Sequence, residues 1–215
     1  MHGLTSAAIR ECTSPQCGFR YPDIYIDPKV ARCPQCGQNA EIIHFIDLTQ
    51  RDNQLKTNGI LAGNVTCVLD NIRSVHNVGS LFRTMHGFGI KDAVLGGITP
   101  TPLHKNFGKT SMCAEEHIQW SSVSNTFKKC QSLKDSGSIL ISFEISDKAK
   151  PIKCFERPEE STNMVFIVGN EISGIDPSIL KISDQILSIP ILGINKSFNV
   201  TVAFGIGLYA CLSVP

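Results

Sequence analysis

The expected fold is decided by Ile167-Val-Gly-Asn-Glu-Ile-Ser-Gly174 and Ile189-Pro-Ile-Leu-Gly-Ile-Asn-Lys-Ser-Phe-Asn-Val-Thr-Val-Ala203, two stretches of this 215-residue chain. A third stretch, Asn77-Val-Gly-Ser-Leu-Phe-Arg83, precedes them. Each places glycine and small polar or amide side chains beside an apolar run. In such positions, backbone groups can be left free to bind a ligand. The three stretches therefore predict loops that form a binding site.

Short apolar runs alternate with helical patterns around these stretches. Helices are expected after Asn77 and from Thr126 to Lys134. The runs expected to form strands are Val65–Leu69, Ala93–Leu95, Ile139–Phe143, Met164–Val168 and Gln185–Ile189. This alternation predicts an α/β fold with a mainly parallel sheet and helices on both faces.

Composition limits the classes of protein that remain. Hydrophobic residues make up 42% of the chain, enough to bury the core of one domain of about 150 residues beside a small accessory unit. The net charge of +1 provides no global field for nucleic acid, so any RNA contact would depend on local clusters. No apolar run reaches the roughly 18 residues of a membrane span, and residues 1–15 lack a signal-peptide pattern. We expect a cytoplasmic protein with no membrane partner.

Four of the nine cysteines form two closely spaced pairs, Cys12-x4-Cys17 and Cys33-x2-Cys36, and a glycine follows each pair. Four thiolates at two turns can complete a tetrahedral structural zinc site. A unit this small has little core of its own, so it would need the ion to stay folded. Iron of the rubredoxin kind and a metal-free thiol set are the alternatives. The other five cysteines are expected to be reduced.

The chain is expected to divide into two domains. Residues 1–47 form a zinc-ribbon β unit with strand-like runs at Ile24–Ile26 and Glu41–Ile46. The polar residues 48–63 are a linker, and residues 64–215 form the α/β domain.

The first stretch is expected to begin a helix with Asn77 as its N-cap. Val78, Leu81, Phe82 and Met85 follow helical spacing and form its buried face, whereas Ser80 and Arg83 fall on the accessible face. A guanidinium group there could hold a phosphate or a carboxylate, although a solvated surface arginine is the alternative.

The other two stretches are expected at one edge of the sheet. Gly169-Asn-Glu171 follows a buried strand, at the end where α/β sheets bind ligands, although a simple capped turn is the alternative. Ser197 or Asn199 is expected to cap the last helix. Gly205 and Gly207 inside that helix each cost about 1 kcal/mol relative to alanine, which indicates close approach to another backbone or to a partner subunit.

In order and content, the three stretches resemble the motifs of the SpoU family of RNA 2′-O-ribose methyltransferases, a branch of the knotted SPOUT class that uses S-adenosylmethionine (AdoMet). The resemblance covers roughly residues 64–212. It implies a C-terminal trefoil knot and AdoMet held by backbone groups. It also implies a homodimer and a tRNA or rRNA substrate that bridges both subunits.

The resemblance also implies roles for individual residues. Arg83 would position the RNA and stabilise the 2′-alkoxide rather than remove the proton, because a guanidinium group is a poor base. The active-site set is Asn77, Arg83, Glu171, Ser197 and Asn199. The AdoMet-lining set is Phe143, Glu144, Ile145, Gly169, Asn170, Ile189, Leu192, Gly193 and Phe198. Two residues depart from the family pattern, Phe198 where leucine is usual and Thr201 where serine is common.

A basic loop adds a weaker signal. Residues 99–110 gather His104, Lys105 and Lys109 beside prolines, as expected for phosphate contact or for a merely solvated loop. In the resembling family this loop borders the RNA-binding face. A P-loop is excluded because Leu103 stands where its first glycine is required.

Two other functions compete with ribose methylation. One is a non-catalytic zinc-ribbon factor with a knotted domain that binds RNA or protein, and the other is base methylation by another knotted branch. The presence of all five active-site residues favours an enzyme, because a binding module has no need for the whole set.

Overall fold

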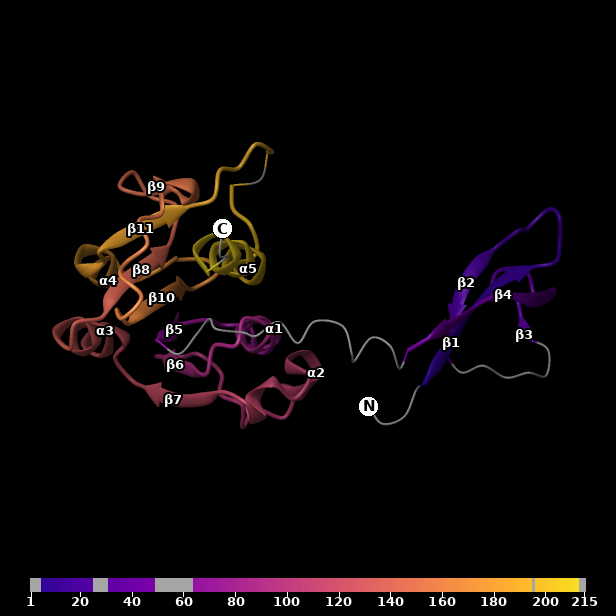
Figure 1. The fold of residues 1–215 in the computed structure, drawn as a ribbon, viewed down its shortest axis with the longest axis horizontal. Coiled ribbons are helices and arrows are strands. Elements are labelled where there is room, and N and C mark those ends of the chain that lie inside the picture. Colours follow the sequence, from indigo (N-terminus) through magenta and orange to yellow (C-terminus); the bar gives the residue numbers. More distant parts are fainter. Residues whose placement is uncertain (1–4, 25–30, 49–63, 195, 213–215) are drawn as a thin grey trace. The chain divides into compact units, whose positions relative to one another are not determined.

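The computed structural model describes residues 5–24, 31–48, 64–194 and 196–212. The chain divides into two compact units, Met1–Asn58 and Gly59–Pro215, which we describe separately (Figure 1). The expected linker at 48–63 lies almost wholly outside the described residues, so the domain boundary stays a prediction. No helix in the described part of the chain has both the length and the apolar character that crossing a bilayer requires.

The first unit contains a four-stranded antiparallel sheet with the strand order β2-β1-β4-β3. Its strands are β1 (Ser6–Cys12), β2 (Arg20–Asp23), β3 (Ala31–Arg32) and β4 (Asn39–Asp47). The expected run Glu41–Ile46 lies inside β4. Of the expected run Ile24–Ile26, Ile24 forms a bend after β2 ends at Asp23, and the other two residues lie outside the described residues.

The second unit is built on a seven-stranded sheet with the order β7-β6-β5-β10-β8-β11-β9. All the pairings between its described strands are parallel. The strands are β5 (Val65–Asp70), β6 (Asp92–Gly96), β7 (Gln119–Val123), β8 (Ile139–Phe143), β9 (Lys150–Pro151), β10 (Met164–Gly169) and β11 (Gln185–Ser188). The expected fold class is therefore confirmed, whereas the knot implied by the resemblance stays a prediction.

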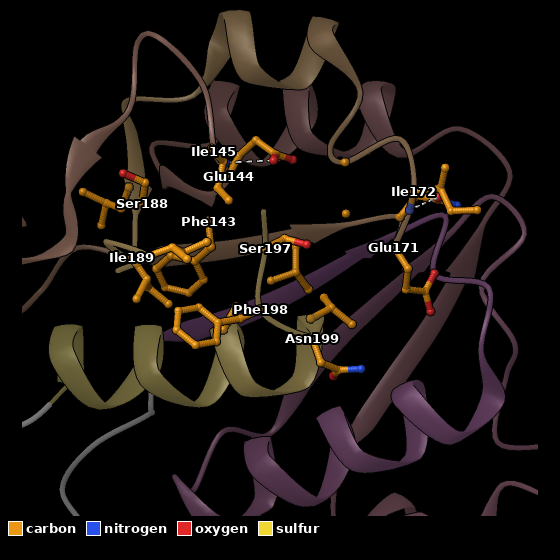
Figure 2. A pocket seen from close by; sticks show the side chains of 18 residues that line it. Phe143, Glu144, Ile145, Glu171, Ile172, Ser188, Ile189, Ser197, Phe198 and Asn199 are labelled. Carbon is orange, nitrogen blue, oxygen red and sulfur yellow. Dashed lines mark hydrogen bonds between the residues drawn. The ribbon is translucent and has the colours of Figure 1, made fainter. Parts of the chain in front are cut away.

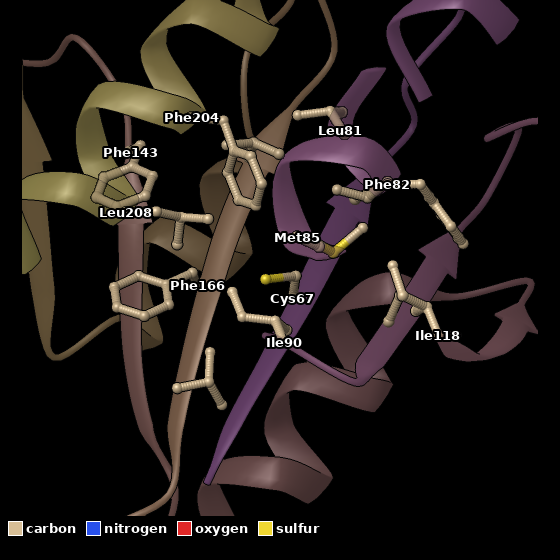
Figure 3. Packing of buried hydrophobic residues seen from close by; sticks show 14 of the residues in the cluster. Cys67, Leu81, Phe82, Met85, Ile90, Ile118, Phe143, Phe166, Phe204 and Leu208 are labelled. Carbon is tan, nitrogen blue, oxygen red and sulfur yellow. The ribbon is translucent and has the colours of Figure 1, made fainter. Parts of the chain in front are cut away.

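Helices cover both faces of this sheet (Figure 1). They are α1 (Val75–Gly87), α2 (Gly108–Ser111), α3 (Thr126–Asp135), α4 (Pro177–Ile182) and α5 (Val200–Leu212), with short 3-10 turns η2 (Ala114–Glu116) and η3 (Ile152–Cys154). Side chains of α1 and α5 pack over Cys67 and Phe166 of the strands, as Figure 3 shows. The alternate strand residues, such as Val68 and Ile167, face α3 and α4. The buried face expected for α1 is confirmed.

The register of the sheet brings three chain segments to one edge. Asp70 at the end of β5 pairs with Gly96 at the end of β6 and with Gly169 at the end of β10. Because parallel strands end at the same edge, the loops that follow these residues emerge side by side.

The first residue of α1 differs from the expectation. Ser74, not Asn77, is the N-cap, and its hydroxyl accepts a hydrogen bond from the Asn77 backbone N–H at 3.3 Å. Both residues are good caps, and Ser74 takes the position because the helix begins at Val75. The Asn77 side chain is thereby left free for another contact.

One of the two glycines of α5 is explained by a contact within the chain. A Cβ atom on Gly207 would lie 2.6 Å from the Phe143 ring, so the close approach is to a side chain of the same chain. A Cβ on Gly205 would meet only Thr84, at an ordinary 3.9 Å. Gly207 is therefore explained by contacts within the chain, whereas the expected partner contact of Gly205 stays a prediction.

The two glycines can be separated by substitution. Gly207→Ala should lower the free energy of unfolding by about 1–3 kcal/mol relative to Gly205→Ala, because it overpacks the Phe143 ring. Gly205→Ala should be neutral or stabilising by up to about 1 kcal/mol, because alanine favours the helix. Urea unfolding followed by circular dichroism would measure both. Equal stability of the two variants would contradict this account of Gly207.

Candidate active site

A cavity of about 380 Å³ opens where strands β8, β10 and β11 end and α5 begins (Figure 2). Its walls combine the ends of these strands with the loops that follow them. It is lined by Phe143, Glu144, Ile145, Val168, Gly169, Asn170, Glu171, Ile172, Gly174, Leu187, Ser188, Ile189, Ile191, Ser197, Phe198, Asn199, Val200 and Ala203. The cavity therefore lies at the edge of the sheet at which the sequence predicts a ligand site.

Most of the expected AdoMet-lining residues line this cavity, but two do not. Leu192 and Gly193 lie outside the lining, and the Leu192 side chain is 99% exposed. The lining residues that the sequence analysis did not single out are Val168, Ile172, Gly174, Leu187, Ser188, Ile191, Val200 and Ala203. All of them flank the expected residues, and the rule that parallel strands bind ligands at their carboxyl ends could have found Leu187 and Ser188.

The turn after β10 is held by the side chain of Asn170. Its Oδ1 accepts hydrogen bonds from the backbone N–H groups of Ile172 at 2.9 Å and Ser173 at 3.1 Å. Its Nδ2 donates to the carbonyl oxygen of Asn71 at 2.7 Å. Asn170 thus stabilises its own turn and connects it to the loop after β5.

Glycine is required at the first residue of this turn. A Cβ atom on Gly169 would collide with the backbone of Gly174 and Ile175, so no larger residue fits without moving the turn. Glu144 holds the other end of this turn, because its carboxylate accepts hydrogen bonds from the backbone N–H groups of Ile145 and Ile175, both at 2.8 Å. The cavity wall is therefore preorganised by hydrogen bonds within the protein.

The Glu171 carboxylate joins this turn to the start of α1. It accepts hydrogen bonds from the backbone N–H groups of Arg73 at 2.9 Å and Ser74 at 3.1 Å, and from Asn77 Nδ2 at 2.8 Å. Partial burial alone would raise the pKa of Glu171, but these donated hydrogen bonds lower it below its ordinary value. The Glu171 carboxylate is an anion near neutral pH. It lies at the N-terminus of α1, where the helix dipole favours negative charge.

Asn77 and Arg83 do not line the cavity. Asn77 reaches it through Glu171, whereas Arg83 lies on the exposed side of α1, six residues further along. The expected active-site set is thus arranged in two groups. Glu171, Ser197 and Asn199 lie at the cavity, and the two residues of the first stretch belong to the adjoining helix.

Asn199 is the cap of α5. Its Oδ1 accepts from the backbone N–H of Thr201 at 2.9 Å and from the Thr201 hydroxyl at 2.6 Å. Threonine at 201 therefore keeps the hydroxyl contact that serine could make. The neighbouring Phe198 is 42% exposed and lies near Phe143 and Ile189 on the apolar side of the cavity (Figure 2).

The cavity suits a nucleoside-sized ligand with one flat apolar part. Phe143, Ile189 and Phe198 form an apolar side (Figure 2), and the polar residues of the lining include Glu144, Asn170, Glu171, Ser197 and Asn199. A few polar groups around an apolar surface are typical of cofactor pockets, whose volumes are about 300–1,000 Å³. The residues present thus fit AdoMet.

The four paired cysteines of the first unit come together as one cluster. Their sulfur atoms lie within 4.8 Å of one another, with Cys12 and Cys36 at 3.4 Å and Cys17 and Cys33 at 3.8 Å. Zinc–sulfur bonds of about 2.3 Å in a tetrahedron would place the sulfurs about 3.8 Å apart. The glycine after each pair, Gly18 or Gly37, has a positive φ, as expected at such turns. The cluster therefore fits a four-coordinate zinc ion.

Solved structures with the same fold include methyltransferases. A TrmH/SpoU tRNA-modifying enzyme of Aquifex aeolicus is 24% identical with a TM-score of 0.61, and the match covers 68% of this chain and 73% of that one. An AdoMet-bound rRNA methyltransferase from Sinorhizobium meliloti is 22% identical with a TM-score of 0.64, covering 69% and 56% of the two chains. At these identities the likeness shows the fold alone.

Sequence relatives point to the same group. A Staphylococcus aureus protein named for the TrmH family of tRNA/rRNA methyltransferases is 25% identical over 181 residues, which cover 84% of this chain and 71% of the relative. A tRNA (guanosine(18)-2′-O)-methyltransferase of Aquifex aeolicus is 28% identical over 140 residues, which cover 65% and 64%. Residues 64–209 match the SpoU rRNA Methylase family. Because this match spans more than half of the sequence and all three motif stretches, the chain belongs to the SpoU family of RNA methyltransferases.

Proposed function

We propose that the protein transfers a methyl group from AdoMet to a ribose 2′-hydroxyl of tRNA or rRNA. The observation that carries this proposal is the cavity built from the second and third motif stretches and tied to the first through Glu171. The relative named as a tRNA (guanosine(18)-2′-O)-methyltransferase supports the ribose oxygen as the acceptor. The AdoMet-bound structure with the same fold supports the cofactor.

Different residues of this chain would bind AdoMet and RNA, according to their positions. When bound, AdoMet supplies an electrophilic methyl group. Phe143, Ile189 and Phe198 would hold its apolar part, and the backbone of the 169–174 turn would hold its polar part. Arg83, exposed on α1, would bind the RNA backbone and stabilise the charge that develops on the ribose oxygen.

Glu171 has a positioning role in this proposal rather than a direct catalytic one. Its carboxylate accepts hydrogen bonds from three donors at the N-terminus of α1. It therefore holds the helix that carries Arg83 against the 169–174 turn. An ionised acceptor at a helix N-terminus stabilises both partners.

The cysteine cluster would hold one structural Zn²⁺, and the ribbon would help to select the RNA. A homodimer is supported by the apolar side chains of Val202 and Ile206, which α5 leaves exposed. An enzyme that modifies tRNA or rRNA would work in the cytoplasm.

The function can be tested through Arg83. Arg83→Ala should reduce methyl transfer from labelled AdoMet to total tRNA and rRNA by about 100-fold or more, because one charge-stabilising donor is lost. AdoMet affinity by calorimetry should stay within about twofold of wild type, since Arg83 lies outside the cavity. Lys128→Ala, on the exposed side of α3, is the matched control and should keep full activity. Normal turnover by Arg83→Ala would refute the assigned role.

A second prediction concerns the charge of Glu171. Glu171→Gln should lower the free energy of unfolding by about 1 kcal/mol at pH 7, because the amide is neutral and cannot accept from all three donors. The folded-state pKa is depressed, so the stabilisation is present above the unfolded pKa of about 4.3 and disappears as the pH falls through the lower folded value. The difference between wild type and variant should therefore shrink below about pH 4. Thermal unfolding at several pH values tests this, and a pH-independent difference would argue against it.

A third prediction concerns the metal. Purified protein should contain one zinc per chain by mass spectrometry of the elements, and Cys33→Ser should lose it. Limited proteolysis should then degrade the first unit, while the second unit still binds AdoMet, because the cluster lies entirely in the first unit. Cys113→Ser, which removes an exposed cysteine outside the cluster, is the control. Iron in place of zinc, or a stable ribbon without metal, would rule out this assignment.

A further inference from the structure

The basic loop, residues 99–110, presents an exposed leucine at a turn. The backbone N–H of His104 donates to the Thr101 carbonyl oxygen at 3.0 Å, which closes a β-turn with Pro102 and Leu103 at its centre. Proline in the first central position is preset for such a turn. The Leu103 side chain is 85% exposed, so the turn holds a large apolar group out in solvent.

The turn is fixed at both of its ends. Upstream, the buried Thr99 hydroxyl lies 2.7 Å from the Gly96 carbonyl oxygen and accepts from the Ile72 backbone N–H at 3.0 Å. Downstream, the buried ring of Phe107 packs edge-on against Phe82 of α1, with ring centres 5.1 Å apart. Leu103 is therefore held out in solvent by a loop that is anchored on both sides.

Basic residues follow this leucine in the sequence. His104, Lys105 and Lys109 are exposed, and residues 97–113 include no aspartate or glutamate. A second turn, in which the Phe107 backbone N–H donates to the His104 carbonyl oxygen at 2.8 Å, places Lys105 next to the first turn. A partner that matches this surface combines negative charge with flat apolar groups. RNA with unstacked bases has both properties.

The loop also lies next to the candidate active site. It leaves the sheet after Gly96, at the edge where the motif loops begin, and the Ile98 backbone N–H donates to Asn71 Oδ1 at 3.2 Å. The carbonyl oxygen of the same Asn71 accepts a hydrogen bond from the side chain of Asn170, in the 169–174 turn, at 2.7 Å. One residue thus connects the basic loop with the cavity wall.

We propose that the side chain of Leu103 packs against an unstacked nucleobase of the substrate RNA. This base belongs to a nucleotide next to the one whose ribose enters the active site. Lys105 and Lys109 bind the flanking phosphates and fix the position of the strand. Apolar side chains that wedge between bases are a known means of unstacking them, and phosphate contacts supply the register. The inference rests on the proposed function and adds to it a requirement for an unpaired segment in the RNA.

The test uses the full chain and total RNA from cells that lack this protein, with methyl transfer from labelled AdoMet as the readout. Leu103→Ala and Leu103→Ser should lower kcat/KM for RNA about tenfold, because the apolar contact between Leu103 and the RNA base is lost. Leu103→Met, which keeps an apolar side chain of similar size, should retain most of the activity. AdoMet affinity and thermal stability should not change in any of the three, because Leu103 lies outside both the cavity and the core.

The lysines provide a separate readout. Lys105→Ala combined with Lys109→Ala should raise KM and make RNA binding less dependent on salt concentration, because phosphate contacts are lost. Lys148→Ala, on the loop after β8, is the control and should leave both unchanged.

The outcomes separate this inference from the proposed function. Wild-type protein that methylates no RNA overturns both. Wild-type protein that is active, together with full activity of Leu103→Ala, overturns the role of Leu103 alone. A smaller particle by light scattering for Leu103→Ala would assign the leucine to subunit contact and would also overturn its role in RNA binding.

Discussion

The hydrogen bonds between Glu171 and the start of α1 connect the parts of the site that come from distant segments of the chain. The carboxylate accepts from Arg73, Ser74 and Asn77, while its own backbone belongs to the turn that forms one wall of the cavity. Without this anion, the three donors at the N-terminus of α1 would need other hydrogen-bond partners. The arrangement is possible because β5 and β10 are adjacent parallel strands that end in register, so their loops meet.

The core imposes a second constraint on the same cavity. Phe143 forms part of the cavity wall and also packs in the cluster between the sheet and α5. Its ring occupies the space that a side chain on Gly207 would need. The glycine therefore lowers helix propensity in order to admit a ring that shapes the binding site. Packing and function are coupled at this position, so a change in α5 reaches the cavity through Phe143.

The elements that the sequence predicted well are those with strong local patterns. Val65–Leu69, Ile139–Phe143 and Met164–Val168 are apolar runs that end at polar or glycine residues, and the observed strands agree within one residue. β7 (Gln119–Val123) was not expected, because this edge strand is mostly polar and has no clear alternation. The role of Glu171 also could not be read from the sequence, because its partner Asn77 lies 94 positions away. Such contacts depend on strand order, which local pattern does not determine.

The near-neutral charge of the chain limits how it can bind RNA. Each phosphate contact adds affinity that salt weakens, and a net charge of +1 leaves few lysines and arginines uncompensated. Residues 97–113 concentrate positive charge without any carboxylate, at the edge of the sheet that also forms the cavity. Recognition through so few charges requires additional contacts that salt does not screen, and apolar contact with bases is of this kind. In the proposed complex, the exposed Leu103, which directly follows Pro102 in that same segment, would supply such a contact where the substrate has to be positioned for methyl transfer.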